Sequence, residues 1–169
     1  MRHLLLAATL ALAAAPVAAQ PDLPFSPAGT EACLLRAEGV LREVCVGLSA
    51  AACIDTPDGY TTVGMSTCLG KEAEYWDGRL NAAYQALLEV DGQVDAELAE
   101  LGSAAAPMVP ALREMQRAWI AFRDASCLYE YTQWGGGTGS GPASNECVMR
   151  ITARQALALE DRLAQKQAQ

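Results

Sequence analysis

Histidine is almost absent from this sequence, which has a single one, His3, among 169 residues. His3 lies in a stretch that we expect to be removed as a signal peptide, so the mature chain would contain none. Histidine is the usual general base at neutral pH and the commonest metal ligand. A catalytic triad, a zinc site or a proton shuttle is therefore not expected. We predict no metal, no cofactor and no catalytic residues, since an enzyme would need carboxylates alone.

Basic residues are also scarce, with 12 Lys and Arg against 20 Asp and Glu and a formal charge of −8. Loss of Arg2 with the signal peptide would leave 11 basic against 20 acidic residues, a formal charge of −9. This balance disfavours nucleic acid and anionic membrane surfaces, and it favours encounters with cationic partners. An ordinary acidic surface of a soluble protein would show the same balance of acidic and basic residues.

Residues 1–19 have the features of a secretory signal peptide: a basic start, an apolar run over residues 4–15 and small residues at 17–19. The apolar run is too short for a membrane-spanning helix. We expect cleavage before Gln20, and no cysteine stands there to carry a lipid anchor. The 150 residues that remain are enough for one domain, which we expect to be periplasmic or secreted.

Six cysteines follow this segment: Cys33, Cys45, Cys53, Cys68, Cys127 and Cys147. No Cys-x-x-Cys occurs, which argues against a redox-active pair or a zinc ribbon. An even number of cysteines in an exported chain predicts three disulfides. We favour Cys127 with Cys147, because a glycine-rich turn lies between them. The other four would complete a sequential pattern as Cys33–Cys45 and Cys53–Cys68, but a crossed arrangement among them is left open.

The N-terminal third is predicted to contain short elements. Residues 20–29 include three prolines and predict an extended leader with little structure. Thr30 is expected to cap a helix to about Ala37, and apolar residues from Val40 onward predict a second helix up to Cys53. Residues 55–59 have the composition of a turn.

Three longer helices are predicted after this turn. The first covers about residues 66–90, and Asp91-Gly92 marks its end or a kink. Its apolar stripe consists of Trp76, Leu80, Ala83, Tyr84 and Leu87. The second covers about residues 110–129 and should bury Leu112, Met115, Trp119 and Phe122. The third covers about residues 144–164 and should bury Val148, Ile151, Gln155, Leu159 and Leu163. Strand alternation is nearly absent, so the predicted fold is all-α, an antiparallel helical domain over residues 30–169 stapled by disulfides.

Two of these helices carry stretches that mix aromatic, aliphatic and polar residues at helical spacing. They are Trp76-Asp77-x-x-Leu80-Asn81-x-x-Tyr84 and Gln116-Arg117-Ala118-Trp119-Ile120-x-Phe122-Arg123-Asp124-x-x-Cys127. In order and residue type, these stretches resemble the secreted LprI-like family of lysozyme inhibitors, typified by the lipoprotein inhibitor of mycobacteria. The resemblance covers about residues 53–163, and the cysteine-bearing segment 33–53 is extra.

The resemblance implies a protein of the cell envelope that binds a cationic lysozyme and protects peptidoglycan, and that is not an enzyme. The alternative is a structural or adaptor protein of the periplasm that binds another envelope component without inhibiting anything. A hydrolase ranks third, because the spacing of Glu72 and Glu74 to Asp77 is not special among the carboxylate pairs of an acidic helical protein.

Polar residues in the two stretches form a candidate structural network: Asp77, Asn81, Tyr84, Gln116, Trp119, Arg123 and Asp124. They lie near apolar stripe positions, so we expect a buried network that fixes the register of the two helices, with Arg123 pairing across to Asp77 or Asn81. The other interpretation is a recognition surface.

Two further features could contact a partner. In the glycine-rich loop, Trp134, Gly135, Gly136 and Gly137 could enter a concave cleft, because the expected disulfide would lower the ordering cost of binding. Otherwise the loop is a connector whose Trp134 folds back on the domain. An acidic set could instead dock on a basic enzyme, or form ordinary solvated helix faces. It consists of Glu72, Glu74, Asp91, Asp95, Glu97 and Glu100.

Overall fold

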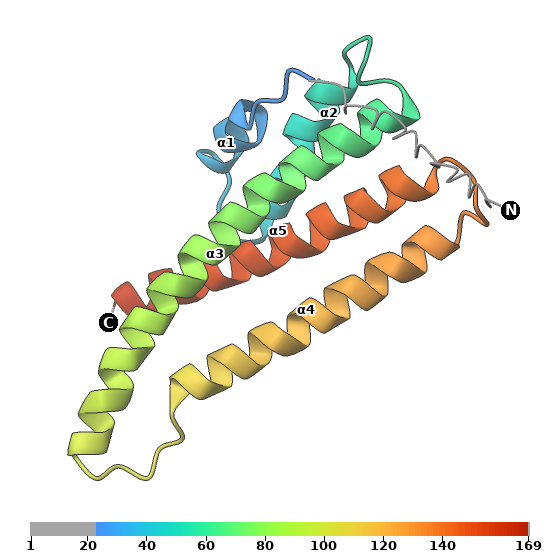
Figure 1. Ribbon diagram of the computed structural model, residues 1–169. Helices are drawn as coiled ribbons and strands as arrows, with labels where there is room; N and C mark the ends of the chain where they lie inside the picture. Colours follow the sequence, from blue (N-terminus) through green and yellow to red (C-terminus); the bar gives the residue numbers. More distant parts are fainter. Residues whose placement is uncertain (1–22, 169) are drawn as a thin grey trace, which may run out of the picture.

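The computed structural model describes residues 23–168, and the predicted signal peptide lies outside this range. The described chain is helical, as the sequence predicted. Its elements are α1 (Ala28–Leu34), the 3-10 helix η1 (Gly39–Cys45), α2 (Leu48–Ile54), α3 (Thr62–Glu100), α4 (Met108–Thr132) and α5 (Ser140–Gln167). The long helices α3 and α5 form the central pair, with α1, η1 and α2 on one side and α4 on the other (Figure 1).

The core lies between α3 and α5. The predicted α3 stripe is confirmed at Trp76, Leu80, Ala83 and Leu87, which are all buried, while Tyr84 is half-buried at its edge. On α5 the buried face is displaced by one residue from the prediction, and Leu159 is the one predicted residue that is fully buried. Val148 and Leu163 are half-buried and pack against the core, and Ile151 and Gln155 are half-buried as well. The buried apolar residues of α5 are Met149, Ala153, Ala156, Leu157 and Leu159. Two of them are alanines with no exposed surface, so α5 packs closely against its neighbours at these positions.

Helix α3 is longer than predicted and does not end at Asp91-Gly92. It begins at Thr62, where the Thr61 hydroxyl accepts a hydrogen bond from Gly64 N at 2.9 Å. Asp91 is buried and forms an ion pair of 2.6 Å with Lys166 near the end of α5. A helical glycine costs only about 1 kcal/mol relative to alanine. The packing of α3 on α5 therefore carries the helix past Gly92 to Glu100.

The N-terminal segment departs from the prediction at two places. Helix α1 begins at Ala28 behind Pro27, so Thr30 lies inside the helix and is buried instead of capping it. The predicted helix of residues 40–53 is divided into η1 and α2 at Gly47, whose φ of 94° is left-handed. Glycine adopts this conformation at little cost. Gly47 N there donates to the Glu72 carboxylate at 2.8 Å.

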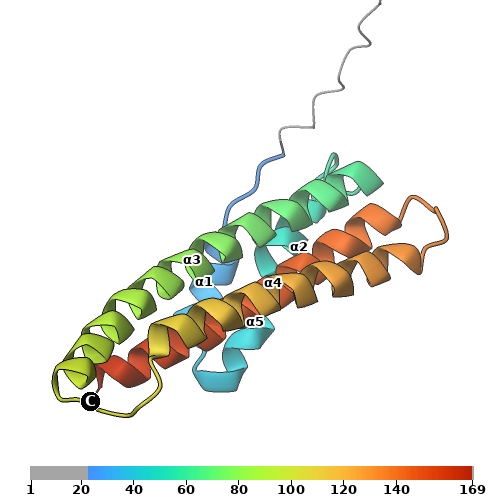
Figure 2. The same ribbon diagram turned by 60° about the horizontal axis from the view of Figure 1, so that its bottom comes forward.

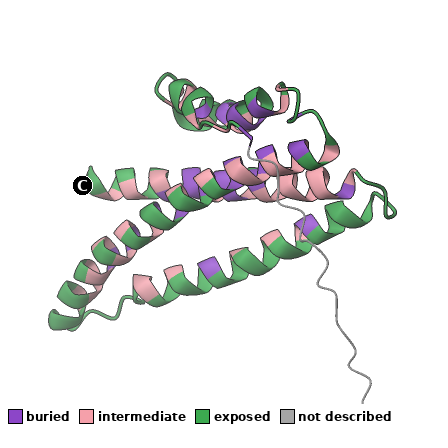
Figure 3. Cartoon of the chain, turned by 45° about the horizontal axis from the view of Figure 1, so that its top comes forward, coloured by how far each residue is buried: buried purple, intermediate pink, exposed green. Residues whose placement is uncertain are grey.

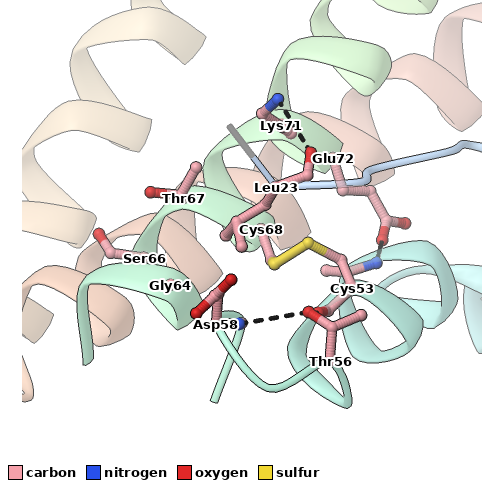
Figure 4. The surroundings of a disulfide bond; sticks show 12 residues. Leu23, Cys53, Thr56, Asp58, Gly64, Ser66, Thr67, Cys68, Lys71 and Glu72 are labelled. Atoms are coloured by element: carbon pink, nitrogen blue, oxygen red, sulfur yellow. Dashed lines mark hydrogen bonds between the residues drawn. A yellow bond between two sulfur atoms is a disulfide. The ribbon is translucent and has the colours of Figure 1, made fainter. Parts of the chain in front are cut away.

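Three disulfides connect the chain in the sequential pattern: Cys33–Cys45, Cys53–Cys68 and Cys127–Cys147. The second joins α2 to α3, and Leu23 packs beside it (Figure 4). Leu23 is only 3% exposed. The end of the predicted leader is therefore part of a small apolar cluster, although residues 23–26 are not helical.

Helix α4 is the least covered of the three long helices (Figures 2 and 3). It packs mainly on α5 and touches α3 much less. Only Gln116 and Cys127 are buried among its 25 residues. The predicted burial of Met115 and Phe122 is wrong, since they are 41% and 61% exposed, while Leu112 and Trp119 are half-buried. A helix that rests on one neighbour cannot bury a wide apolar stripe.

Candidate functional site

A groove of about 410 Å³ lies between α3 and α4, at the level of the two family-like stretches. Its lining consists of Asp77, Leu80, Asn81, Tyr84, Arg113, Gln116, Arg117, Trp119, Ile120 and Arg123. Six of the seven residues of the predicted polar network are among them, and Asp124 lies just beyond. The sequence therefore identified residues that come together in space. The structure places them around an open depression.

The α3 wall of the groove carries polar groups at consecutive turns of the helix. Asn81 Nδ2 donates to Asp77 Oδ2 at 2.8 Å, and both side chains are exposed. Tyr84 follows at the next turn and is half-buried. Its hydroxyl makes no hydrogen bond within the described chain, so it remains free to bind a ligand.

The α4 wall combines an aromatic ring with guanidinium groups. The Arg123 guanidinium lies 5.1 Å from the centre of the half-buried Trp119 ring, in cation–π geometry. Its Nε donates to Asp124 Oδ1 at 2.9 Å. The buried Gln116 lies at the base of this wall, where its Oε1 accepts from Gln155 Nε2 of α5 at 2.6 Å.

The expected network across a buried α3–α4 interface is wrong. Arg123 bonds to a neighbour on its own helix, and Asp77 bonds to Asn81 on α3. The only member that bonds to another helix is Gln116, which reaches α5. The physical reason is that α3 and α4 each pack mainly on α5, so the gap between them stays open at this level.

Sequence reasoning missed the main buried polar residue, Glu72. It was assigned to the acidic surface, but it is fully buried on the side of α3 that faces the N-terminal segment. Its carboxylate accepts four hydrogen bonds: from Thr30 Oγ1 at 2.9 Å, Gly47 N at 2.8 Å, Ala50 N at 2.6 Å and Trp76 Nε1 at 3.2 Å. A signal was present, because Glu72 lies one helical turn before Trp76 and hence on the buried stripe.

Two other members of the predicted acidic surface are also engaged. Asp91 pairs with Lys166, and Asp95 accepts from the backbone N–H groups of Met108 and Val109 at 2.7 and 2.9 Å. These two hydrogen bonds hold the pKa of Asp95 below its ordinary value of 3.8. Glu74, Glu97 and Glu100 remain exposed. The acidic set is therefore no single docking face.

The α4–α5 connection forms a compact tip at one end of the molecule (Figure 1). Gly135 and Gly136 have φ values of 54° and 84°, which make the tight turn possible, and the Cys127–Cys147 disulfide ties the two helices below it. Trp134 folds onto its own loop, since a Cβ at Gly139 would overlap its ring. Trp134 is nevertheless 53% exposed, so its contact with the loop leaves about half of the side chain accessible to solvent.

The tip and the last turns of α4 expose several large apolar and aromatic side chains. They are Leu128, Tyr129, Tyr131 and Trp134. The inner side of Trp134 also lines a mainly apolar pocket of about 670 Å³ formed with α2 and the first turns of α3 and α5. The tip therefore exposes aromatic side chains at one end of the molecule, next to the Cys127–Cys147 disulfide.

Residues 23–168 contain neither a candidate metal site nor a candidate membrane-spanning helix. No group of three or more His, Cys, Asp or Glu side chains in this range is placed to hold a metal ion. Within the same range, no helix is both long and apolar enough to cross a membrane.

Comparison with known proteins gives one family and one relative. A family model described as "Lysozyme inhibitor LprI" matches residues 53–159. An uncharacterized protein of Rhizobium meliloti (strain 1021) is 25% identical over 107 residues, which cover 63% of this chain and 77% of the relative. No solved structure shows a significant match. The matched range holds the groove and the tip, whereas α1, η1 and nearly all of α2 precede it.

Proposed function

This chain belongs to the LprI family of lysozyme inhibitors, and we propose that it is exported and inhibits lysozyme by inserting the α4–α5 tip into the enzyme's substrate cleft. The family is one of inhibitors, which agrees with the absence of a histidine-based catalytic site in the sequence. Three disulfides and no free cysteine in the described chain support export to an oxidising compartment.

The α4–α5 tip is proposed as the binding surface because it exposes aromatic side chains next to a disulfide. A substrate cleft is concave, so the part of an inhibitor that enters it must protrude. Interfaces draw most of their energy from a few aromatic anchors, and a contact held rigid in advance costs less entropy to bind. The tip offers both, because it exposes Tyr129 and Trp134 above the Cys127–Cys147 disulfide.

The first test is lysis of purified peptidoglycan by several types of lysozyme, titrated with the oxidised protein from Gln20 to Gln169. An inhibitor should abolish lysis with a saturation point near one protein per enzyme, whatever the amount of peptidoglycan. Binding to the enzyme without loss of lysis would favour the envelope adaptor instead. Undiminished lysis by every type tested would reject the proposal.

The tip is tested with Tyr129→Ala and Trp134→Ala. Each should weaken inhibition at least tenfold while the midpoint of thermal unfolding (Tm) of Tyr129→Ala stays unchanged, because Tyr129 is 65% exposed. Leu101→Ala is the matched control, since Leu101 is 81% exposed and follows α3 at the opposite end of α4. Normal inhibition by both tip variants would move the contact elsewhere on the protein.

A further inference from the structure

The α3–α4 groove is a second surface with its own chemistry, distinct from the tip. It is lined by all three arginines of α4, Arg113, Arg117 and Arg123, and by one carboxylate, Asp77. The lining therefore carries more positive than negative charge, although Glu114 and Asp124 lie just outside it and pair with Arg117 and Arg123. Arginine side chains gathered on one wall of a groove attract an anionic ligand.

Hydrogen bonds and ion pairs within the protein leave donors of these arginines available to a ligand. Arg113 makes no hydrogen bond or ion pair with any other described residue. Arg117 pairs with Glu114 on its own helix, where both side chains are largely exposed, and such pairs contribute little. Arg123 lies over the Trp119 ring and pairs with Asp124 on its own helix, and these two contacts fix its position. Arg113 and Arg117 therefore have guanidinium groups that can bind a carboxylate in the bidentate manner.

The opposite wall restricts the kind of anion. Asp77 would repel a ligand that carried only phosphate or carboxylate groups, but it accepts hydrogen bonds from hydroxyl or amide groups. Asn81 and Tyr84 can both donate and accept. Trp119 and Tyr84 add half-buried ring surface to these polar groups. The groove is therefore complementary to a ligand that combines hydroxyl or amide groups, apolar ring faces and carboxylates.

We propose that this groove binds a sugar chain that carries carboxylate groups, of the kind that makes up uncross-linked peptidoglycan strands. Its sugar rings would lie against Trp119 and Tyr84, its hydroxyl and amide groups would bond to Asp77 and Asn81, and its carboxylates would pair with Arg113 and Arg117. The volume of about 410 Å³ falls in the range of small-ligand sites. Such binding would place an inhibitor on the polymer that its target enzyme attacks.

The test measures binding in the absence of lysozyme, by calorimetry with soluble peptidoglycan strands. The wild-type protein should bind these strands at least tenfold more tightly than a neutral N-acetylglucosamine oligomer of equal length or a polyglutamate peptide. Arg113→Glu and Arg117→Glu should each weaken binding at least tenfold. Arg162→Glu, the same charge change at an exposed α5 position outside the groove, should not.

Three results would overturn the proposal: no binding of the strands, equal binding of the neutral oligomer or the peptide, and unchanged binding by both groove variants. Inhibition of lysozyme on a small soluble substrate separates this proposal from that of the tip. On the soluble substrate, Arg113→Glu should inhibit lysozyme normally and Tyr129→Ala should not. In the strand-binding assay, Arg113→Glu should bind weakly and Tyr129→Ala should bind normally. If Arg113→Glu lost inhibition on the soluble substrate, the groove would be binding the enzyme and the assignment to sugar would fail.

Discussion

The two sides of the α3–α5 pair are built in opposite ways. On one side, the N-terminal cover, residues 23–54, is attached by the Cys53–Cys68 disulfide, by the Glu72 carboxylate, and by ion pairs from Arg42 to Glu160 and Asp161. On the other side, α4 is fixed at its end by Cys127–Cys147, at its start by Asp95 and midway by Gln116. Between these points most of α4 is exposed.

The two sides therefore differ in how far their polar groups are satisfied within the domain. The cover satisfies its polar groups internally and closes one face of α3. Helix α4 leaves arginine and tyrosine side chains facing solvent, which is what a binding surface requires. The match to the LprI family takes in all of α4 and begins only at the end of the cover. The cover and the α3–α4 groove thus lie on opposite sides of the central pair.

The largest effect is expected at Glu72, where the cover depends on one carboxylate. Glu72→Ala leaves buried donors on Thr30, Ala50 and Trp76, and a half-buried one on Gly47, without their acceptor. Unsatisfied buried donors cost about 1 to 3 kcal/mol each, so we expect the free energy of unfolding to fall by roughly 4 kcal/mol. Urea unfolding of the oxidised protein measures this.

The matched control is Glu74→Ala, two residues further along α3 and exposed. It should change the free energy of unfolding by less than about 0.5 kcal/mol. Equal losses in the two variants would mean that the cover does not depend on Glu72.

The disulfides should have similar global effects but different local ones. Cys53–Cys68 and Cys127–Cys147 span 15 and 20 residues, so the loop-entropy model gives nearly equal stabilisation, about 3 kcal/mol each. With both cysteines of a pair changed to alanine, hydrogen exchange should differ. Loss of Cys127–Cys147 should expose amides in the last turns of α4, whereas loss of Cys53–Cys68 should leave Ala50 protected by Glu72. Equal exposure of both segments would contradict the contrast between the two sides.

The helices could be predicted from the sequence because periodic apolar residues identify a face directly. The α3 stripe from Trp76 to Leu87 is such a case. Boundaries were less accurate where a distant group decides them: Lys166 satisfies Asp91 inside α3, and Asp95 starts α4 at Met108. Local patterns do not contain these partners. Glu72 was misplaced for the same reason, since its four donors include residues from α1, α2 and the turn between η1 and α2.

The groove residues were named from the sequence as a buried network or a recognition surface, but the sequence could not decide whether they are buried between the helices. Helical spacing shows that Asp77, Asn81 and Tyr84 share one face of α3, and that Gln116 and Arg123 share one of α4. Spacing cannot show whether the two faces close on each other. That depends on where α3 and α4 each pack on α5, which is set by the packing of all three helices.

A smaller effect is expected where α4 begins. Asp95→Asn removes the charge that accepts from Met108 N and Val109 N, and it should lower the Tm by a few degrees at neutral pH. Because these bonds lower the pKa of the folded carboxyl from 3.8, the contribution is complete above that value. It is lost as the pH falls through the folded pKa, so the two proteins should converge in Tm at a pH below 3.8, once the folded Asp95 carboxyl is protonated. A constant difference down to that pH would show that the charge of Asp95 is not involved.

The smallest effect belongs to Arg123, and Arg79 is its natural counterpart. Each guanidinium lies over a tryptophan ring, Arg79 at 5.3 Å from Trp76 and Arg123 at 5.1 Å from Trp119. Arg79 also bridges α3 to α5 through two hydrogen bonds to Glu160, at 2.8 and 2.9 Å, whereas Arg123 pairs within α4. Arg79→Ala should therefore cost about 2 kcal/mol of unfolding free energy, and Arg123→Ala less than about 1 kcal/mol. A loss at Arg123 as large as that at Arg79 would mean that the groove closes in solution, and that α4 is as firmly held as the cover.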